Sequence, residues 1–521
     1  MEKTYCDFMD EISTDELYEG LLGYGLFTEK LPPVFTAVPF YNYCETLSEP
    51  FECGGSDYIV YRTMRNIGTP RFLGIPNPIN YQSLCAVLRD SWDEIREHFK
   101  NQTSGQGYKV SRIHIRKKRG TKAIFEMNYK NWHLDGNPDL DLLCRDNATS
   151  RILVKADISD CFPGIYTHSI PWALCGKIRA KENRNNKSEW HNKIDIKCSK
   201  MRNGETHGLH IGPHTSNLIS EIILTVVDKR LFDKGYRYIR NIDDYDCYVE
   251  DEVTAKRFLC DLEEELQKFD LTQNRKKTMI VKLPIEREKN WKNELRKLKL
   301  VTKGEVLDYE QVNMFIDTAL KLSKENNDFA IMNYAIKTLK GMKIKENTKI
   351  VVWKRVMHIA VLYPYLLHII EDHVVKPYQI GQNELKDFAD RIFNEAIAVN
   401  DYESISYAIY FAIKYDFELN QLDKNYANFI KYIEESPDCI MLTMSWVYFM
   451  KKNHMNRTAT QVKPFNRLAA KLEKENMDKY WLFCYEVLPK SKLLGKWHNL
   501  KEASVSFIRD DVWGVQYKGI E

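Results

Sequence analysis

The periodicity of the apolar residues changes near residue 305, and this change divides the chain into two kinds of structure. Before it, short β-branched and aromatic runs such as YIVYRTM, ILVKADI and RYIRNIDDYDCYV alternate with helical patterns such as NLISEIILTVVDKRLFD. After it, apolar residues recur at the spacing of one helix face, as in KDFADRIFNEAIAV and YESISYAIYFAIKY. The sequence therefore predicts an α+β domain over residues 1–305 and an all-α domain over residues 306–521.

The composition is that of a soluble globular protein with a large core. The chain has 521 residues, of which 44% are hydrophobic and 29% are charged, and a net charge of +3 is too small to indicate a nucleic-acid partner by itself. Its apolar runs are shorter than a membrane span of about 20 residues, and the first residues do not resemble a signal peptide. The twelve cysteines form no CxxC pair. We therefore expect a cytoplasmic protein with reduced thiols and no membrane partner.

A ten-residue pattern occurs twice in the second part of the chain. The stretches NDFAIMNYAI, from Asn327, and NDYESISYAI, from Asn400, match in register at Asn, Asp, an aromatic residue, Tyr, Ala and Ile. In both, the aspartate stands where a helix N-cap would stand. A recurring helix start predicts stacked helix pairs of the HEAT-like kind, with chance similarity as the alternative.

Two apolar strands carry carboxylates where burial should exclude them. The stretch ILVKADISDCF leads into Asp157, and RNIDDYDCYV holds Asp243 and Asp244 side by side. If the strands are neighbours, their carboxylates repel one another, and a divalent cation removes that cost. Mg²⁺ prefers carboxylate and phosphate oxygens, and a pair of such ions can assist phosphoryl transfer. The alternative is that each acid caps a turn independently.

Several stretches together resemble a reverse transcriptase, in the order in which that family has them. KADISDCF resembles its motif A, GLHIGPHTSN its motif B, IDDY its motif C and LTQNRKKT its motif D, and RFLGIPNPINYQSLCAVL is similar to its finger segments. GIYTHSIPWAL is most similar to the bacterial abortive-infection and other defence-associated reverse transcriptases. The resemblance implies right-hand polymerase fingers and palm, followed by an α-helical extension.

The resemblance also implies roles for individual residues. Asp157 and Asp243 would bind metal, with Asp244 as a weaker ligand and the backbone carbonyl of Ile158 completing the coordination. The expected ion is Mg²⁺, with Mn²⁺ as the alternative. Phe162 would press on the sugar of the incoming nucleotide and exclude a 2′-OH. An ordinary core phenylalanine is the competing interpretation.

Basic residues are expected to handle the triphosphate. Lys277 matches the motif D lysine that donates a proton to pyrophosphate, and Lys276 is its rival. In RIHIRKKRG, Arg112 and Arg116 would hold the phosphates, unless this stretch is a solvated hairpin turn. Gly212 of motif B would let the backbone approach the nucleotide closely.

Some residues depart from the family pattern. Asn241 and Ile242 stand where motif C has an aromatic residue and then a variable one, which makes primer handling an open question. Asp246 adds a third acid to the same strand. In motif B, His207, His210 and His214 have ligand-like spacing, but zinc is disfavoured because the segment lacks helical geometry and a nearby cysteine.

The predicted function is that of an RNA-directed or template-independent DNA polymerase in antiphage defence. Its expected partners are deoxynucleoside triphosphates, a single-stranded DNA product, a non-coding RNA and further copies of the chain in a trimer or hexamer. Members of the defence group can start synthesis on a tyrosine, and Tyr41 and Tyr43 are the candidates. The alternatives are a catalytically silent scaffold or sensor, and a retron-type or intron-type reverse transcriptase with a dedicated RNA template.

Overall fold

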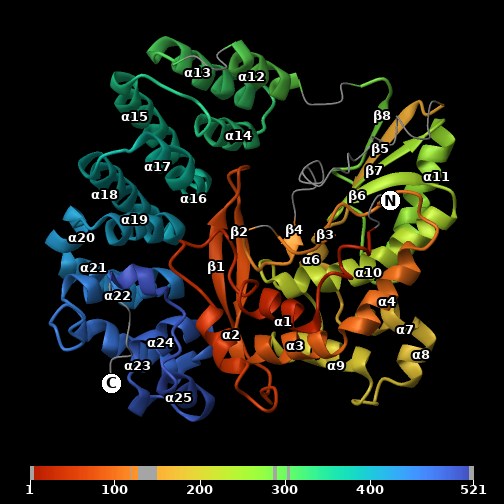
Figure 1. The fold of residues 1–521 in the computed structure, drawn as a ribbon, viewed down its shortest axis with the longest axis horizontal. Helices are drawn as coiled ribbons and strands as arrows, with labels where there is room; N and C mark the ends of the chain where they lie inside the picture. The colour runs from red at the N-terminus through yellow and green to blue at the C-terminus, as the bar shows by residue number, and fades with distance from the viewer. Residues whose placement is uncertain (1–4, 119, 127–148, 286–289, 302–305, 515–521) are drawn as a thin grey trace. The chain divides into compact units, whose positions relative to one another are not determined.

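The computed structural model describes residues 5–118, 120–126, 149–285, 290–301 and 306–514. The chain packs into two compact units (Figure 1). Unit 1 comprises Met1–Thr28, Thr36–Ile59 and Gly74–Ile285, and unit 2 comprises Glu29–Phe35, Val60–Leu73 and Glu286–Glu521. The main segment of unit 2 thus starts before the boundary expected at residues 305 and 306, and the unit also takes two segments from the first 73 residues. The assignment of separate domains to 1–305 and 306–521 remains a prediction.

An antiparallel sheet lies at the centre of unit 1, with the strand order β6-β7-β5-β8. These strands are β5 (Ile152–Asp157), β6 (Arg237–Asn241), β7 (Asp244–Val249) and β8 (Met279–Lys282). The two acid-bearing strands are therefore neighbours, and their register places Asp157 opposite Asp244. Apart from Lys155, every residue of β5 is buried, which explains its almost continuous apolar sequence.

Helices pack around this sheet. Helix α10 (His214–Asp233) is buried along most of its length and packs against α4, α7 and α11, while α11 also contacts β5 and β7 (Figure 1). The remaining helices of unit 1 are α1 (Thr14–Leu22), α2 (Val38–Cys44), α3 (Pro78–Asp90), α4 (Trp92–Thr103), α6 (Cys161–Gly164), α7 (Ser169–Cys175), α8 (Lys177–Glu182), α9 (Trp190–Lys200) and α11 (Glu252–Gln267). The strands β3 (His114–Ile115) and β4 (Phe125–Glu126) form a further hairpin of unit 1. A second hairpin pairs β1 (Tyr58–Met64) with β2 (Pro70–Pro76), and most of its residues, Val60–Leu73, belong to unit 2.

Every named element of unit 2 beyond residue 286 is helical, in agreement with the expected α-helical second part. The longer helices are α12 (Asn290–Val301), α13 (Tyr309–Glu325), α14 (Ala330–Leu339), α15 (Glu346–Leu362), α18 (Gln382–Val399), α19 (Tyr402–Tyr415), α21 (Tyr426–Glu435), α22 (Cys439–Lys452) and α23 (Lys463–Asn476). Shorter helices are α16 (Leu367–Ile370), α17 (Lys376–Tyr378), α20 (Asn420–Lys424), α24 (Trp481–Val487) and α25 (Gly495–Glu502). Within the described residues, no helix is long and apolar enough to cross a bilayer.

The repeated Asn-Asp pair lies at a tight helix connection in both places, but the aspartate caps the next helix in only one of them. Asp401 is the N-cap of α19, as expected, whereas the N-cap of α14 is Phe329, so the expectation is wrong for Asp328. Asn327 and Asn400 adopt left-handed backbone conformations, with φ of 46° and 54°, which asparagine tolerates better than most residues. The aspartate that follows each one accepts a hydrogen bond from a backbone amide at the start of the next helix, Asp328 from Ala330 at 3.0 Å and Asp401 from Ser404 at 3.2 Å. Helices α13 and α14 pack together, as do α18 and α19. The HEAT-like stacking of such pairs remains a prediction.

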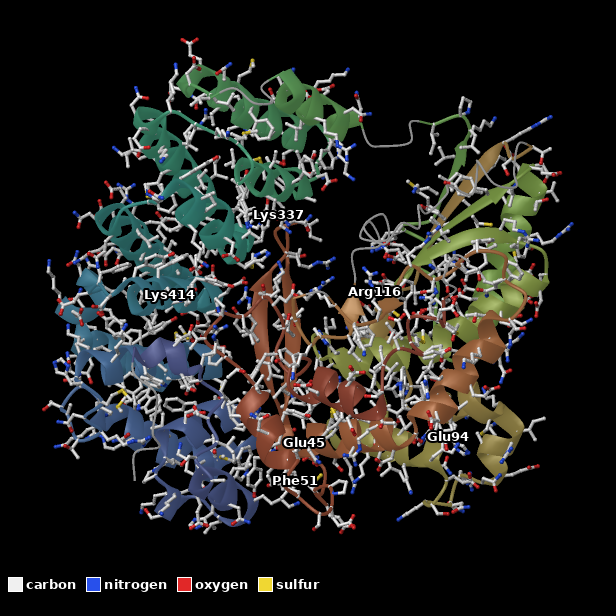
Figure 2. All side chains as sticks on the ribbon, in the orientation of Figure 1. Glu45, Phe51, Glu94, Arg116, Lys337 and Lys414 are labelled. Carbon is white, nitrogen blue, oxygen red and sulfur yellow. The ribbon has the colours of Figure 1, made fainter. Side chains whose placement is uncertain are left out.

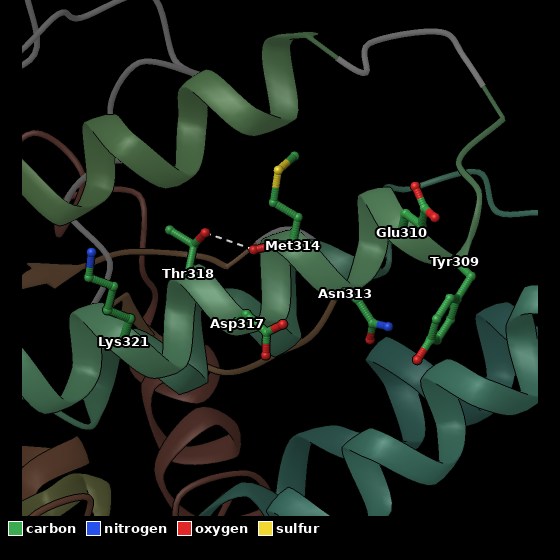
Figure 3. Close-up of a pocket in the computed structure, with 7 residues that line it drawn as sticks. All are labelled: Tyr309, Glu310, Asn313, Met314, Asp317, Thr318 and Lys321. Carbon is green, nitrogen blue, oxygen red and sulfur yellow. Dashed lines mark hydrogen bonds between the residues drawn. The ribbon is translucent and has the colours of Figure 1, made fainter.

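A shallow pocket follows one face of α13 (Figure 3). Its lining mixes the exposed side chains of Tyr309 and Met314 with polar groups, and Thr318 donates a hydrogen bond of 2.7 Å to the Met314 carbonyl. None of the site residues expected from the sequence lies on this face. The candidate chemistry therefore lies elsewhere, in unit 1.

A buried carboxyl group in unit 2 holds the tip of the β1–β2 hairpin. Glu403 of α19 accepts hydrogen bonds from the Thr63 hydroxyl at 2.5 Å and the Met64 amide at 2.7 Å. Burial raises the pKa of Glu403 to about 7, despite these donors. The folded protein therefore holds this proton more tightly than the unfolded chain does, so raising the pH from about 4.5 to 7 costs stability.

Replacing Glu403 by glutamine should remove this pH dependence. Relative to the wild type, we expect the free energy of unfolding of the variant to rise by up to about 3 kcal/mol between pH 5 and pH 8, because the amide does not ionise. Urea denaturation at both pH values measures the difference, and the exposed Glu346→Gln serves as the control. Parallel pH profiles for the wild type and Glu403→Gln would contradict the expectation.

Candidate active site

Three aspartates meet at the ends of β5 and β7. Asp157 is the last residue of β5, Asp243 lies in the turn between β6 and β7, and Asp244 opens β7. One carboxylate oxygen from each lies within 4.8 Å of the others. Asp157 is buried, Asp243 half-buried and Asp244 exposed, so the group faces solvent on one side only. Such a group of carboxylates can hold a cation that a ligand from solution also contacts.

The turn that carries Asp243 is held in an unusual conformation. Asn241 pairs with Asp244, which leaves a two-residue turn, and Ile242 in that turn has a φ of 62°. A β-branched residue is disfavoured there by roughly 1–3 kcal/mol. Two hydrogen bonds secure the turn, from Arg240 Nη1 to the Ile242 carbonyl at 2.8 Å and from the Ile158 amide to the Asp243 carbonyl at 3.1 Å. The second bond ties the turn directly to the end of β5.

Arg240 connects this turn to helix α10 through a buried ionic network. Its guanidinium is fully buried and donates to Glu221 at 3.1 Å and to Asp228 at 2.7 and 2.9 Å. The Tyr5 hydroxyl also donates to Glu221, at 2.6 Å, and the Tyr238 hydroxyl donates to Asp228, at 3.1 Å. Every charge of the network thus has several partners, as burial requires. This network is not predicted from the sequence, although two acids seven residues apart in an apolar helix, Glu221 and Asp228, are a pattern that indicates a buried partner.

A lysine neutralises part of the negative charge. Lys277 Nζ donates to Asp157 Oδ2 at 2.7 Å, and this bond together with the nearby Asp244 and Asp243 raises the pKa of Lys277. Burial and then the carboxylates of Asp243 and Asp157 raise the pKa of Asp244 to about 6. Lys276 and Lys277 are both exposed, and the amine that contacts Asp157 is that of Lys277, the residue preferred from the sequence.

The donor set fits a hard divalent cation such as Mg²⁺. Asp157 Oδ1 is buried, and among the described residues it has no hydrogen-bond partner, so a second ligand atom remains available beside the one that Lys277 contacts. Three carboxylates and no softer donor form the group, which suits magnesium rather than zinc. Asp157, Asp243 and Asp244 would hold the ion. The part expected of the Ile158 carbonyl remains a prediction.

The second acid of β7 belongs to a different interaction. Asp246 pairs across the strands with Lys155, whose Nζ donates to Asp246 Oδ1 at 2.9 Å. Both side chains are more than a third exposed. Asp246 is thus engaged in a solvated ion pair and is not part of the group formed by Asp157, Asp243 and Asp244.

The residues expected to bind nucleotide lie in the same unit. Phe162 is on α6 and half-buried, which leaves part of its ring accessible. Arg112 is buried, and its amide donates to the Arg240 carbonyl at 2.8 Å, so its segment runs beside β6. Arg116 lies at the β3–β4 hairpin, 5.5 Å from the ring of Phe8 (Figure 2). Gly212 has a φ of 130°, a conformation that favours glycine. Triphosphate binding by these residues remains a prediction.

The tyrosines proposed for priming lie on α2. Tyr41 packs edge-on against Tyr18 of α1, with 5.9 Å between the ring centroids. Burial and then nearby carboxylates raise the pKa of Tyr41 to about 12, and burial also raises the pKa of Tyr43. A raised pKa makes the nucleophilic phenolate harder to form at neutral pH. Priming by either residue stays a prediction.

The three histidines of motif B lie in different surroundings. His210 is buried, which lowers its pKa to about 3, and its ring lies 4.2 Å from that of Tyr58. His214 contacts the Phe125 ring edge-on, and His207 is exposed. In the described part of the chain, the aspartate group is the one set of three or more potential metal ligands that comes together. The three histidines do not form a zinc site there.

Comparisons with known proteins leave the family of this chain open. No protein-family model matches the chain, and no curated protein matches it. Among solved structures, it is similar to three of the telomerase from Candida tropicalis. An apo form truncated from its C-terminal domain is 13% identical, with 47% of this chain and 54% of that chain covered and a TM-score of 0.29. The complex with a fragment of telomeric RNA is 13% identical, with coverages of 71% and 66% and a TM-score of 0.29. The apo telomerase is 11% identical, with coverages of 82% and 71% and a TM-score of 0.30. This chain thus spans about half the length of the first of these structures.

Proposed function

We propose that the protein is a metal-dependent nucleotidyltransferase of the reverse-transcriptase type, which adds deoxynucleotides to a growing DNA strand. The observation that carries the proposal is the meeting of Asp157, Asp243 and Asp244 beside Lys277 at the ends of two neighbouring antiparallel strands. Carboxylates gathered in this way repel one another, so the protein gains little from them unless a cation and a phosphate ligand bind. Phosphoryl transfer is the reaction that this combination of groups suits best.

In this reaction the residues of the chain bind, orient and supply a proton. Bound magnesium would supply positive charge against the phosphate oxygens. Asp157, Asp243 and Asp244 would fix the position of the phosphates through that charge, and the bond from the Ile158 amide to the Asp243 carbonyl keeps two of the acids in register. Lys277, whose ammonium group contacts Asp157, lies where it can give a proton to the leaving pyrophosphate or neutralise its charge.

An incorporation assay tests the proposal. The purified protein is given Mg²⁺ and each labelled dNTP singly, with and without co-purified RNA, and any product is digested with protease or with nuclease. Incorporation that depends on Mg²⁺ is expected. A product whose mobility shifts after protease treatment supports priming on a tyrosine, and dependence on the RNA supports an encoded template. Absence of incorporation under all of these conditions would reject the polymerase and favour the silent scaffold or sensor.

Replacing Phe162 by alanine should weaken discrimination against ribonucleotides. The ring stands five residues after Asp157 and is half-buried, so we expect it to fill the space that a 2′-OH would need. The ratio of kcat/KM for dNTP over rNTP should fall by about 10- to 100-fold. The exposed Phe72→Ala, measured in the same way, is the control. An unchanged ratio would mean that Phe162 does not contact the sugar.

We extend the proposal to antiphage defence in a bacterium, on the resemblance of the residues after Asp157 to defence-associated reverse transcriptases. Cells that express the wild type should survive phage challenge better than cells that express an inactive variant at equal level. Equal survival would remove the defence role without affecting the polymerase. The proposed trimer or hexamer is tested by light scattering of the purified protein, for which a monomeric mass is the contrary result.

A further inference from the structure

An aromatic cluster lies on unit 1 a few residues beyond Phe162. The rings of Tyr166 and His207 are stacked, with centroids 4.8 Å apart and planes at 25°. Trp172 meets Tyr166 edge-on at 5.7 Å, and His168 does so at 4.8 Å. His207 is exposed, and the side chain of His168 is 47% exposed. The stack therefore ends in an imidazole ring that solvent can reach, rather than in the core.

A dense group of cations borders this cluster. Residues 177–187 contain five lysines or arginines and one glutamate. All five cations are exposed, and within the described residues none of them forms an ion pair with a carboxylate: Lys177, Arg179, Lys181, Arg184 and Lys187. Lys177 Nζ also lies 3.8 Å from the centroid of the Trp172 ring. Five exposed cations beside a single glutamate in the same segment attract anions, so the group points to an anionic partner from solution.

The backbone fixes the cluster near the proposed active site. Leu209 and Gly208 donate their amides to the carbonyls of Phe162 and Ile165, each at 2.8 Å, and Thr167 donates to Thr206 at 2.7 Å. His207 reaches Tyr166 through this pairing. Phe162 and Tyr166 are four positions apart in the chain, so their Cα atoms are at most about 14 Å apart.

This arrangement requires a glycine at position 208. Its φ is 93°, and a Cβ atom there would lie 2.8 Å from Arg202 Nη1 and 3.1 Å from the Pro163 carbonyl oxygen. Glycine therefore lets the chain pass close to residues 163 and 202 and turn His207 onto the Tyr166 ring.

We propose that this surface, formed by Tyr166, His168, Trp172, His207, Lys177 and Arg179, binds single-stranded nucleic acid. Unpaired bases would stack on the exposed end of the His207–Tyr166 pair, and their phosphates would lie against Lys177 and Arg179. A duplex hides the faces of its bases, so it can use the cations but not the stack. As a binding surface it stands independently of the polymerase, and its role in guiding template or product rests on the proposed function.

The test measures binding of the full chain to a fluorescently labelled dT oligomer, its rU counterpart and a duplex of equal length, in EDTA, over a series of salt concentrations. Replacing Tyr166 or His207 by leucine should weaken binding of the single strands by about 5- to 150-fold. Binding of the duplex should change much less. Tyr166→Phe keeps the ring and should restore binding, and Tyr309→Ala removes an exposed ring elsewhere as a control.

The cations are tested separately. The double variant Lys177→Gln and Arg179→Gln should lower the slope of log K against log salt by about 0.7 for each phosphate that the protein no longer neutralises. The control with the same change of charge, Lys490→Gln and Lys492→Gln on the exposed surface of unit 2, should leave the slope unchanged. Circular dichroism and the thermal midpoint confirm that each variant folds.

Unchanged affinity in the folded Tyr166 and His207 variants would overturn the inference, as would equal reductions for single strands and duplex. Asp246→Asn, which lies outside the aspartate group and is paired with Lys155, should bind the single strands as tightly as the wild type does. A protein that binds them through Tyr166 but incorporates no nucleotide would refute the proposed function and leave this inference intact. Nucleotide incorporation by the wild type, together with unchanged single-strand binding in the Tyr166 and His207 variants, would refute this inference and leave the proposed function intact.

Discussion

Replacing Asp157 by asparagine should lower Mg²⁺-dependent nucleotide incorporation by at least about a thousandfold. The residue is the most buried member of the aspartate group, and its Oδ1 is the buried ligand atom without a described hydrogen-bond partner. An amide keeps the shape of the side chain but removes the charge that a cation requires. Incorporation of labelled dNTP, measured at saturating Mg²⁺, gives the effect directly.

The same substitution should not destabilise the fold, and this separates a metal ligand from a structural residue. Asp157 repels two neighbouring carboxylates, and its ion pair with Lys277, whose side chain is 59% exposed, contributes little. We therefore expect a thermal midpoint equal to or above that of the wild type, and loss of the rise in midpoint that Mg²⁺ causes by binding the folded state. Asp246→Asn, on β7 but paired with Lys155, is the matched control and should stay active. Activity of Asp157→Asn within tenfold of the wild type would refute the assignment.

Replacing Arg240 by methionine should reduce the free energy of unfolding by about 3–5 kcal/mol. The guanidinium is fully buried, and its removal leaves the carboxylates of Glu221 and Asp228 buried without their cation. It also removes the donor to the Ile242 carbonyl, which holds the turn before Asp243. Incorporation should therefore fall even at temperatures at which the variant is folded. Chemical denaturation and the dNTP assay, both at low temperature, measure the two effects.

Two further variants separate charge from geometry at this position. Arg237→Met, on the same strand, removes an arginine whose described hydrogen bonds go to nearby carbonyls, and it should cost under about 1 kcal/mol. Arg240→Lys keeps the charge but cannot reach both acids and the carbonyl, so it should recover part of the stability and less of the activity. A fully active Arg240→Met would show that the network does not position the turn.

The parts of the fold that follow from local patterns could be predicted from the sequence. Strands β5 and β7 are recognisable from their apolar and aromatic residues. The acids at their ends indicate that the two strands are neighbours, since a shared cation would offset the repulsion between them. The helical character of the second part follows from its periodicity, and the start of α19 follows from the capping preference of aspartate, here Asp401. The acids at the strand ends are also visible in short stretches of sequence, so a candidate metal site could be predicted there.

Interactions between segments that are distant in the chain could not be predicted from the sequence. Nothing near Arg240 in the chain indicates that it is fully buried, because its partners Glu221 and Asp228 come from α10 and Tyr5 from the N-terminal region. Residues 29–35 and 60–73 belong to unit 2, although they precede its main segment, Glu286–Glu521, by more than two hundred residues. Such choices depend on which surfaces fit together in three dimensions, and a one-dimensional pattern does not contain that information.

The two copies of the Asn-Asp helix start are not interchangeable parts. The position of Glu403 in the second copy corresponds to Ala330 in the first, so only one copy offers a carboxyl group to the hairpin tip. Tyr407, which corresponds to Tyr334, donates to the Lys30 carbonyl, while the ring of Tyr334 meets Trp291. A chain without the second copy, or with the copies exchanged, would lose the hydrogen bonds to residues 30, 63 and 64. The two copies share their Asn-Asp pair but differ in the side chains that contact other segments, so the first copy cannot replace the second.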